Sequence, residues 1–228
     1  MSAHEMKSLR SNAHNRQHRA RGFSLLEMMI VMAIIIVMAS IGFVSLQPLL
    51  RAQRVTNAYN TTLSALRLAR DNAVAQRTSY KVTFTSIAIP PTNTIRVEPT
   101  VAFGGSQATV TYSLPTDVAF TVVAGIPTAA AATPDRFGVG ATAIDFGYTA
   151  SGTGAGGQSV LYFCPDGSAQ NAVGGAGNCA GNWNGGVVYI ARPGELLSSR
   201  AITVWGGTGR VRGWRLYDIG GIKQWSRQ

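Results

Sequence analysis

The sequence predicts an α+β fold in which a long N-terminal helix packs on an antiparallel β-sheet head. Three observations support this prediction. Residues 23–46 form an apolar run with a single charge, at Glu27. Residues 55–74 repeat apolar side chains at intervals of three and four, as an amphipathic helix does. After residue 79 the chain is rich in Val, Ile, Thr, Tyr and Phe with Gly and Pro between them, which is typical of short strands joined by turns.

The composition restricts the function classes. The chain has 228 residues and a net charge of +10, but only 13% of its residues are charged, against a usual share of roughly 25%. With 46% hydrophobic residues, this argues against disorder and favours a membrane segment or an extracytoplasmic surface. The histidines are His4, His14 and His18. A chain without its first residues therefore has no histidine for a catalytic triad, a zinc site or a general base.

The first element is a basic segment, residues 1–22, with a net charge of +4 and almost no apolar side chains. It cannot form a core and is expected to stay in the cytoplasm. The run 23–46 that follows is long enough for a membrane helix, which needs about 20 apolar residues, so residues after Leu46 are expected outside. A secretory signal peptide is the alternative. Its apolar region is shorter, about 7–15 residues, and ends at a small-x-small cleavage site that is missing here.

The junction of these two segments carries a specific motif. Residues 21–31, RGFSLLEMMIV, resemble the prepilin cleavage and methylation motif of type IV pilins and type II secretion pseudopilins. The resemblance implies that a prepilin peptidase cleaves between Gly22 and Phe23 and methylates the new Phe23 amine. A carboxylate in a membrane span costs a few kcal/mol, so Glu27 is expected to be functional. It would pair with the Phe23 amine of a neighbouring subunit and set the axial register. The alternative is that Glu27 merely reaches the membrane edge.

One helix is predicted from Phe23 to Arg77, with residues 47–79 as its amphipathic continuation. At 1.5 Å per residue it measures roughly 80 Å. Its apolar stripe is expected to pack on a sheet, and its arginines are expected to form a solvated face or to contact neighbouring subunits. The segment Leu63–Val74 resembles the LRLARxxA segment of GspH/FimT-type minor pseudopilins, which narrows the resemblance to a type IV pilin-like fold of that kind.

The β-rich head is predicted over residues 80–228. Its closely spaced strands are expected to form antiparallel sheets. Residues 151–157 and 174–186 are predicted to be glycine-rich loops. Gly152–Gly157 is close to a nucleotide-binding fingerprint, but no long helix follows it, so a surface loop is expected. The predicted strands are 80–88, 94–101, 108–114, 118–123, 143–148, 159–163, 186–191, 201–205 and 209–217.

Cys164 and Cys179 are the only cysteines. Two thiols without histidine make a poor zinc site, and the oxidising location inferred for the head favours a disulfide, worth about 3 kcal/mol for a loop of this size. A free reactive thiol is the alternative. Asp166, Asn171 and Asn178 could offer oxygen atoms to calcium, but one carboxylate is too few. We expect no metal and no cofactor.

The C-terminal region is rich in arginine. Gly209–Arg212 resembles the GRxR motif of FimT-type pseudopilins, which bind DNA during natural transformation. Guanidinium groups neutralise phosphates, and tryptophan can stack on bases. A bulge at Gly213 is expected to turn Val211, Trp214 and Leu216 inward and the neighbouring arginines outward. A charged strand or a subunit contact is the alternative. The candidate DNA-binding residues are Arg210, Arg212, Arg215, Lys223 and Arg227.

Together these features predict a minor pseudopilin, a structural subunit of a type II secretion pseudopilus or a type IV pilus. Its expected partners are other major and minor pseudopilins, the prepilin peptidase, the inner-membrane assembly platform and, before assembly, membrane lipid. It is expected to cross the bacterial inner membrane once with its head in the periplasm, and then to join a periplasmic or extracellular filament. DNA uptake is the alternative function. An enzyme is not expected, because the head has scattered carboxylates and no recognisable nucleophile.

Overall fold

The computed structural model describes residues 23–88, 91–101, 109–138, 142–149, 157–174, 179 and 181–228. The chain forms two compact units, Met1–Gln47 and Pro48–Gln228, and each is described by itself. The predicted leader, residues 1–22 with the cleavage residue Gly22, lies outside the described residues. So does Asn178.

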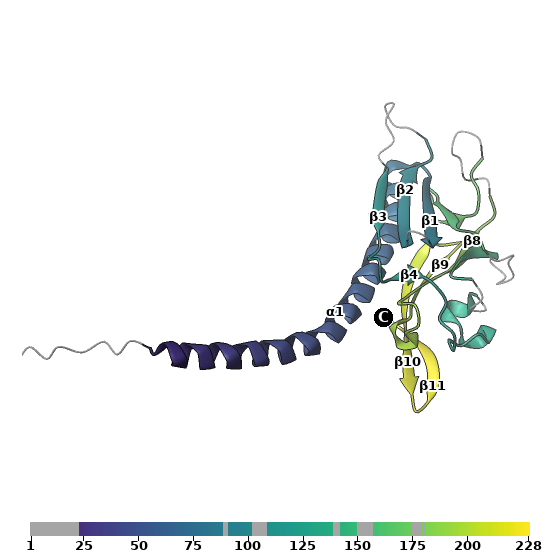
Figure 1. Cartoon of the computed structure of the whole chain (residues 1–228). Coiled ribbons are helices and arrows are strands. Elements are labelled where there is room, and N and C mark those ends of the chain that lie inside the picture. Colours follow the sequence, from purple (N-terminus) through teal and green to yellow (C-terminus); the bar gives the residue numbers. More distant parts are fainter. Residues whose placement is uncertain are drawn as a thin grey trace, which may run out of the picture. The chain divides into compact units, whose positions relative to one another are not determined.

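Helix α1 comprises Leu25–Gln76 (Figure 1), within two residues of the predicted helix at either end. It ends where Arg77 adopts a φ of 52°. This left-handed conformation commonly closes a helix, because it lets the next amides bond the last carbonyls. Pro48 lies inside the helix, at the first residue of the second unit.

The part of α1 in the first unit exposes its large apolar side chains. From Leu25 to Phe43, those that the structure describes are between 43% and 79% exposed. A contiguous apolar surface of this kind marks an interaction surface, because water solvates it poorly. Judged by length and hydropathy together, we find no helix in the described part of the chain that could cross a membrane.

In the second unit, α1 buries one stripe of small and apolar side chains. The stripe follows the spacing predicted for residues 55–74, although Val74 is 45% exposed. Its alanines allow a close approach of the helix backbone to the sheets. The members, each at most 5% exposed, are Val55, Ala58, Tyr59, Thr62, Ala65, Leu66, Ala69 and Ala73.

The first sheet has the order β3-β2-β1-β6-β7 in the described residues, and its neighbouring strands are antiparallel. The hairpin of β1 and β2 forms its centre. The strands are β1 (Tyr80–Ala88), β2 (Pro91–Pro99), β3 (Val110–Ser113), β6 (Val160–Phe163) and β7 (Ala169–Gln170).

The second sheet has the order β11-β10-β9-β8-β4, again antiparallel, and β5 also pairs with β8. Strand β8 is buried along its whole length. The strands are β4 (Ala119–Phe120), β5 (Ile144–Thr149), β8 (Asn184–Ala191), β9 (Arg200–Trp205), β10 (Arg210–Ile219) and β11 (Ile222–Arg227).

The second sheet separates two apolar cores. The larger joins the α1 stripe to both sheets and includes Val188 of β8 and Ile202 of β9. The smaller lies on the opposite face of β8–β10 and includes Tyr189 and Leu216. Adjacent residues of β8 alternate between the two cores because successive side chains of a strand point to opposite faces. This arrangement confirms the predicted helix packed on antiparallel sheets.

Each predicted strand has a counterpart, but β7 and β11 were missed. Strand β11 follows β10 through a two-residue turn, Gly220 and Gly221, with φ values of 61° and 84°. Two glycines between short apolar segments are a hairpin signal, because both central positions of such a turn need positive φ. The sequence therefore contained the information for β11.

The predicted bulge at Gly213 is wrong. The pairing of β10 with β9 continues in register from Arg210 to Arg215, so the residues alternate regularly. Arg212 and Trp214 therefore share one face, and Arg215 lies on the other, toward α1. Gly213 is required for a different reason: a Cβ there would lie 1.6 Å from the Tyr59 hydroxyl oxygen. Glycine allows β10 to approach the helix.

Candidate functional site

The N-terminal motif begins the described chain. Phe23 is 74% exposed, and Glu27 lies in the first turn of α1, where a carboxylate interacts favourably with the helix dipole. The next turns carry an apolar groove lined by Leu25, Met28, Met29, Met32, Ala33 and Ile36. A charged group at the helix start is thus followed directly by apolar surface.

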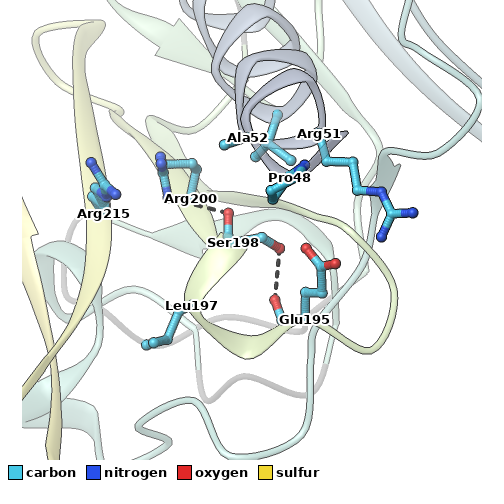
Figure 2. A pocket seen from close by; sticks show the side chains of 9 residues that line it. Pro48, Arg51, Ala52, Glu195, Leu197, Ser198, Arg200 and Arg215 are labelled. Carbon is cyan, nitrogen blue, oxygen red and sulfur yellow. Dashed lines mark hydrogen bonds between the residues drawn. The ribbon is translucent and has the colours of Figure 1, made fainter. Parts of the chain in front are cut away.

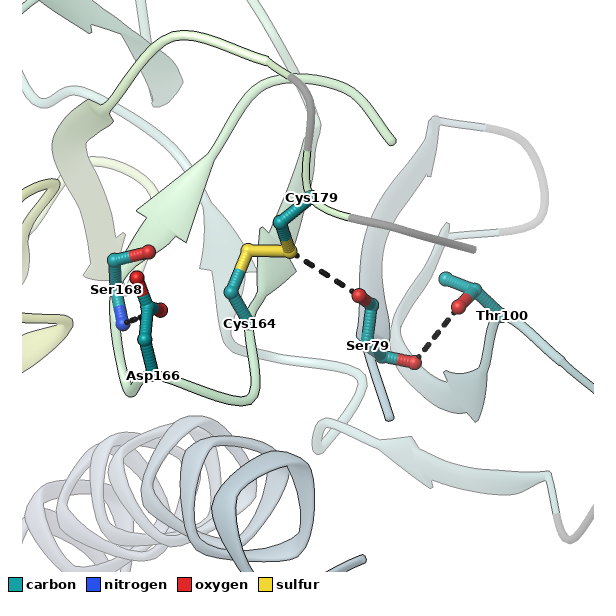
Figure 3. Close-up of a disulfide and its surroundings, with 6 residues drawn as sticks. All are labelled: Ser79, Thr100, Cys164, Asp166, Ser168 and Cys179. Carbon is teal, nitrogen blue, oxygen red and sulfur yellow. Dashed lines mark hydrogen bonds between the residues drawn. A yellow bond between two sulfur atoms is a disulfide. The ribbon is translucent and has the colours of Figure 1, made fainter. Parts of the chain in front are cut away.

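Cys164 and Cys179 form a disulfide, with their Cα atoms 5.9 Å apart (Figure 3). The bond links the end of β6 to a residue 15 positions later. The Ser79 hydroxyl lies 3.1 Å from the Cys179 sulfur, and the Ser79 carbonyl accepts a hydrogen bond of 3.0 Å from the Thr100 hydroxyl. The disulfide therefore lies beside the start of β1, which directly follows α1.

Asp166 caps a turn beside the disulfide. Its carboxylate accepts a 2.8 Å hydrogen bond from the Ser168 amide (Figure 3). Hydrogen bonds from Ser168 lower the pKa of Asp166 below its ordinary value, because they stabilise the charged form. Within the described residues there is no group of three His, Cys, Asp or Glu side chains that could hold a metal ion.

The predicted DNA-binding residues do not form one surface. Arg212 forms an ion pair with Asp135, and both side chains are largely buried, at 22% and 5% exposure. The same carboxylate accepts a hydrogen bond from Thr203, and the Arg212 guanidinium lies 5.8 Å from the centre of the Trp205 ring. Arg212 is therefore held inside the head by a neutralising partner.

Arg210 is exposed and lies near basic residues of the helix. It lines a pocket with Arg67, Arg70 and Asp71 of α1. The Arg70 Nε donates to the carbonyl oxygens of Gly167 and Thr208, each at 3.3 Å. Arg70 thus holds two turns of the head against the helix, while the exposed Arg67 and Arg210 remain available to a partner.

The last two candidates lie on the β11 hairpin. Lys223 pairs with Asp218, and this hydrogen bond lowers the pKa of Asp218. Arg227 is exposed and lies opposite Trp214 in the ladder. The hairpin therefore offers one arginine together with one neutralised lysine.

Arg215 lies on the helix-facing side of β10, opposite Arg200 of β9. Both line a pocket with Pro48, Arg51 and several other residues of the second unit (Figure 2). Arg200 is only 6% exposed, and burial, followed by the charge of Arg215, lowers its pKa to about 10. Arg200 therefore remains charged at neutral pH.

Four basic residues of these sites were not among the predicted candidates: Arg67 and Arg70 beside Arg210, and Arg51 and Arg200 in the pocket of Arg215. The helix arginines were expected to be a solvated face or a subunit contact, but Arg70 and Arg54 contact the head, and Arg54 lies 3.3 Å from Asp117. Strand register could have indicated Arg200, because it follows from the antiparallel pairing of β9 and β10. Arg67 and Arg70 could not be found in this way, because only the tertiary structure shows that α1 lies close to the β9–β10 turn.

Comparison with known proteins identifies one feature. Residues 17–43 match the family model of the prokaryotic N-terminal methylation motif. No curated protein and no solved structure matches the chain. The chain thus carries the N-terminal methylation motif of type IV pilins and pseudopilins. This motif implies processing by a prepilin peptidase, assembly with other pilins and a structural subunit rather than an enzyme.

Proposed function

We propose that this chain is a minor pseudopilin, a structural subunit of a type II secretion pseudopilus or type IV pilus. The observation that carries the proposal is the methylation motif at residues 17–43, followed by a helix that is apolar and exposed in its first part and packed on a β-rich head in its second. The GspH/FimT-like segment Leu63–Val74 supports the assignment to the minor pseudopilins. Its Leu66, Ala69 and Ala73 belong to the buried stripe of α1.

Processing is the first step of the proposed function. A prepilin peptidase cleaves after Gly22 and methylates the Phe23 amine. Coexpression with such a peptidase, followed by intact-mass measurement, tests this step: the product should begin at Phe23 and carry one additional methyl group. The matched control is Gly22→Leu, which should retain the leader. An unchanged wild-type mass in cells that process a known prepilin would contradict the proposal.

Assembly is the second step. Cleavage would give Phe23 a charged amine four residues before the carboxylate of Glu27, at the start of a helix whose next turns carry apolar surface. A buried charge needs a partner, and a neighbouring subunit can supply one by pairing its Phe23 amine with Glu27. The pair then selects one axial register among the many that a uniform apolar surface permits.

Crosslinking in cells tests the role of Glu27. Glu27→Ala and Glu27→Gln should be processed normally but should enter filaments at least tenfold less, whereas Glu27→Asp should recover part of the incorporation. Asp71→Ala, which removes an exposed carboxylate elsewhere on α1, is the matched control and should assemble normally. Equal incorporation of the Gln variant would exclude charge pairing as the cause.

Localisation follows from the same motif. We propose that the apolar segment 23–46 anchors the precursor in the bacterial inner membrane, with the head in the periplasm, before it joins the filament. The methylation motif and the exposed apolar surface of Leu25–Phe43 support this anchor. Alkaline extraction of membranes should leave the wild type in the pellet. Recovery of the full chain in the soluble fraction would contradict membrane anchoring.

DNA binding is a second candidate function, supported by the exposed Arg210 beside Arg67 and Arg70. Phosphate contacts by arginine weaken steeply with salt. In a mobility-shift assay at low salt, Arg210→Ala should weaken binding several-fold and reduce the salt slope by about one. Arg212→Ala should do less, because Asp135 neutralises it. Arg96→Ala, an exposed arginine of β2, is the control. Identical binding by Arg210→Ala would refute this candidate.

A further inference from the structure

Arg200 and Arg215 form a pair of like charges within the head. They are directly opposite each other in the β9–β10 ladder, where like charges are destabilising. In Figure 2 the two side chains lie side by side, while the guanidinium of Arg51 points away from them. The protein keeps two guanidinium groups adjacent at a position where one is nearly buried.

Neither arginine has an acidic partner in the described part of the chain. The ion pairs found there involve Arg54, Lys81, Arg96, Arg192, Arg212 and Lys223. Glu195 lines the same pocket, but its carboxylate is paired with Arg192. The local positive charge is therefore uncompensated, which is unusual for a buried arginine.

One buried donor of the pair has no hydrogen-bond partner. The Nη1 atom of Arg200 donates to the carbonyl oxygens of Ser198 and Ser199, at 3.2 and 3.3 Å. The Arg215 guanidinium lies 5.1 Å from the centre of the Tyr217 ring, and its Nε is buried without a hydrogen-bond partner. Stacking on an aromatic ring leaves the edge of a guanidinium free for an oxyanion.

The pocket has a mixed lining. Arg200 and Arg215 lie beside each other in it, Arg51, Glu195 and Ser198 are its other polar residues, and Pro48, Ala52, Val55 and Leu197 supply apolar surface. Its volume is about 230 Å³. Two adjacent guanidinium groups match the several oxygens of a phosphate group, to which arginine binds in a bidentate manner. The apolar residues of the lining suit a ligand that carries carbon beside the phosphate.

We propose that Arg200 and Arg215 form a binding site for the oxyanion of a phosphate ester. A membrane phospholipid headgroup and a soluble phosphate ester share this chemistry. Binding of a lipid headgroup depends on the proposed membrane anchoring. Pro48 and Ala52 of the pocket follow the apolar run 23–46 within a few residues of sequence, so an anchored chain would bring the pocket's helix residues close to the membrane in sequence. The soluble source does not depend on it.

Thermal unfolding of the full mature chain in a nonionic detergent tests the site. A ligand that binds the folded state at about 100 times its Kd should raise the Tm by about 5 °C or more for a chain of this size. The probes are inorganic phosphate, glycerol 1-phosphate and micellar short-chain phosphatidylglycerol. Chloride at equal ionic strength and phosphatidylcholine of equal chain length are the references.

The variants separate this site from general charge effects. Arg215→Gln should abolish the Tm rise, and Arg215→Lys should keep part of it. Arg96→Gln, at an exposed arginine of β2 that does not line this pocket, is the matched control and should respond like the wild type. If Arg215→Gln fails to fold, calorimetry of glycerol 1-phosphate binding to Arg215→Lys and Arg96→Gln makes the same comparison. Weaker binding is then expected only for Arg215→Lys.

Each outcome decides the proposal. A response to phosphatidylglycerol alone supports the site and identifies lipid as its source, while a response to all three probes supports a soluble ester. No response beyond the chloride reference, or an equal response in Arg215→Gln, overturns it. Duplex DNA is a fourth probe, and a response to it alone also overturns the proposal, in favour of a nucleic-acid surface. The glycerol 1-phosphate probe requires no membrane. This part of the test can therefore be interpreted even if the proposed membrane anchoring is wrong.

Discussion

The two parts of helix α1 have opposite surroundings. In the first unit, the large apolar side chains from Leu25 to Phe43 that the structure describes are all exposed, whereas in the second unit Leu66 and its neighbours in the stripe are completely or almost completely buried. The first part therefore depends on other molecules for its burial, and the second part is buried by its own chain. One helix thus combines an intermolecular surface with an intramolecular core.

This difference follows from side-chain size. The first part carries Leu, Met and Ile around its whole circumference, as a helix surrounded by apolar neighbours does. The second part uses Ala58, Ala65, Ala69 and Ala73 along one stripe and arginines elsewhere. Small residues allow close packing on a sheet, and the arginines keep the remaining faces in water or in contact with the head.

Matched truncations at one position of each part give the largest expected difference. Leu66→Ala should lower the free energy of unfolding of the head by about 4 kcal/mol, because it leaves a cavity in a fully buried site. Ile36→Ala, at a side chain that is 67% exposed, should change it by less than about 0.5 kcal/mol but should weaken filament incorporation. Urea unfolding in detergent and crosslinking in cells measure the two effects. A large loss of head stability in Ile36→Ala would contradict the distinction between an exposed first part and a buried second part of α1.

The disulfide stabilises the head without involving the first part of α1. Replacing both cysteines with serine should lower the free energy of unfolding by about 3 kcal/mol, since the unfolded chain loses a closed loop. Processing at Phe23 should be unaffected. Urea unfolding of the double variant and of the reduced wild type should agree. A double variant as stable as the oxidised wild type would show that the bond contributes little.

Local patterns predicted the helix and most strands. The spacing of Val55, Tyr59, Leu66 and Ala73 was enough to identify the buried stripe, because helical periodicity determines which residues share a face. The disulfide was predicted from the presence of only two cysteines and from the oxidising location inferred for the head. The methylation motif is contiguous, so it required no knowledge of the fold.

Other features depend on contacts that sequence does not reveal. Gly213 suggested a bulge, but its actual requirement is the Tyr59 hydroxyl of a helix more than 150 positions earlier. Because of the predicted bulge, Arg215 was expected to point outward on the same face as Arg210 and Arg212. The structure places it on the opposite face of β10. Regular alternation places Arg212 beside Asp135 and Arg215 beside Arg200. The arginine-rich segment therefore contains residues with three different surroundings.

The contact between Gly213 and Tyr59 tests how closely the second part of α1 approaches the sheet. Gly213→Ala should lower the free energy of unfolding by about 2 kcal/mol, because the added Cβ forces helix and strand apart. Tyr59→Phe removes the nearest atom, so the double variant should recover part of the loss in a double-mutant cycle. Strictly additive effects would show that the two positions are not coupled.

The smallest expected effect is a pH dependence that belongs to the head alone. Burial and then the charge of Asp145 raise the pKa of Tyr148 to about 12 from its ordinary value of 10, and burial also raises the pKa of Tyr189. Folding therefore favours the neutral phenol. This stabilisation is complete below pH 10 and is lost as the pH rises from 10 toward 12.

Tyr148→Phe should accordingly flatten the fall in Tm between pH 10 and 12, while the control Tyr217→Phe, at an exposed tyrosine of β10, should follow the wild-type curve. The apolar part of α1 from Leu25 to Phe43 contains no tyrosine, so filament contacts made by that surface should not share this alkaline transition. Crosslinking at each pH reports whether the filaments are still assembled. If they dissociate at the pH at which the head unfolds, the two parts of the helix are coupled more tightly than their separate surroundings indicate.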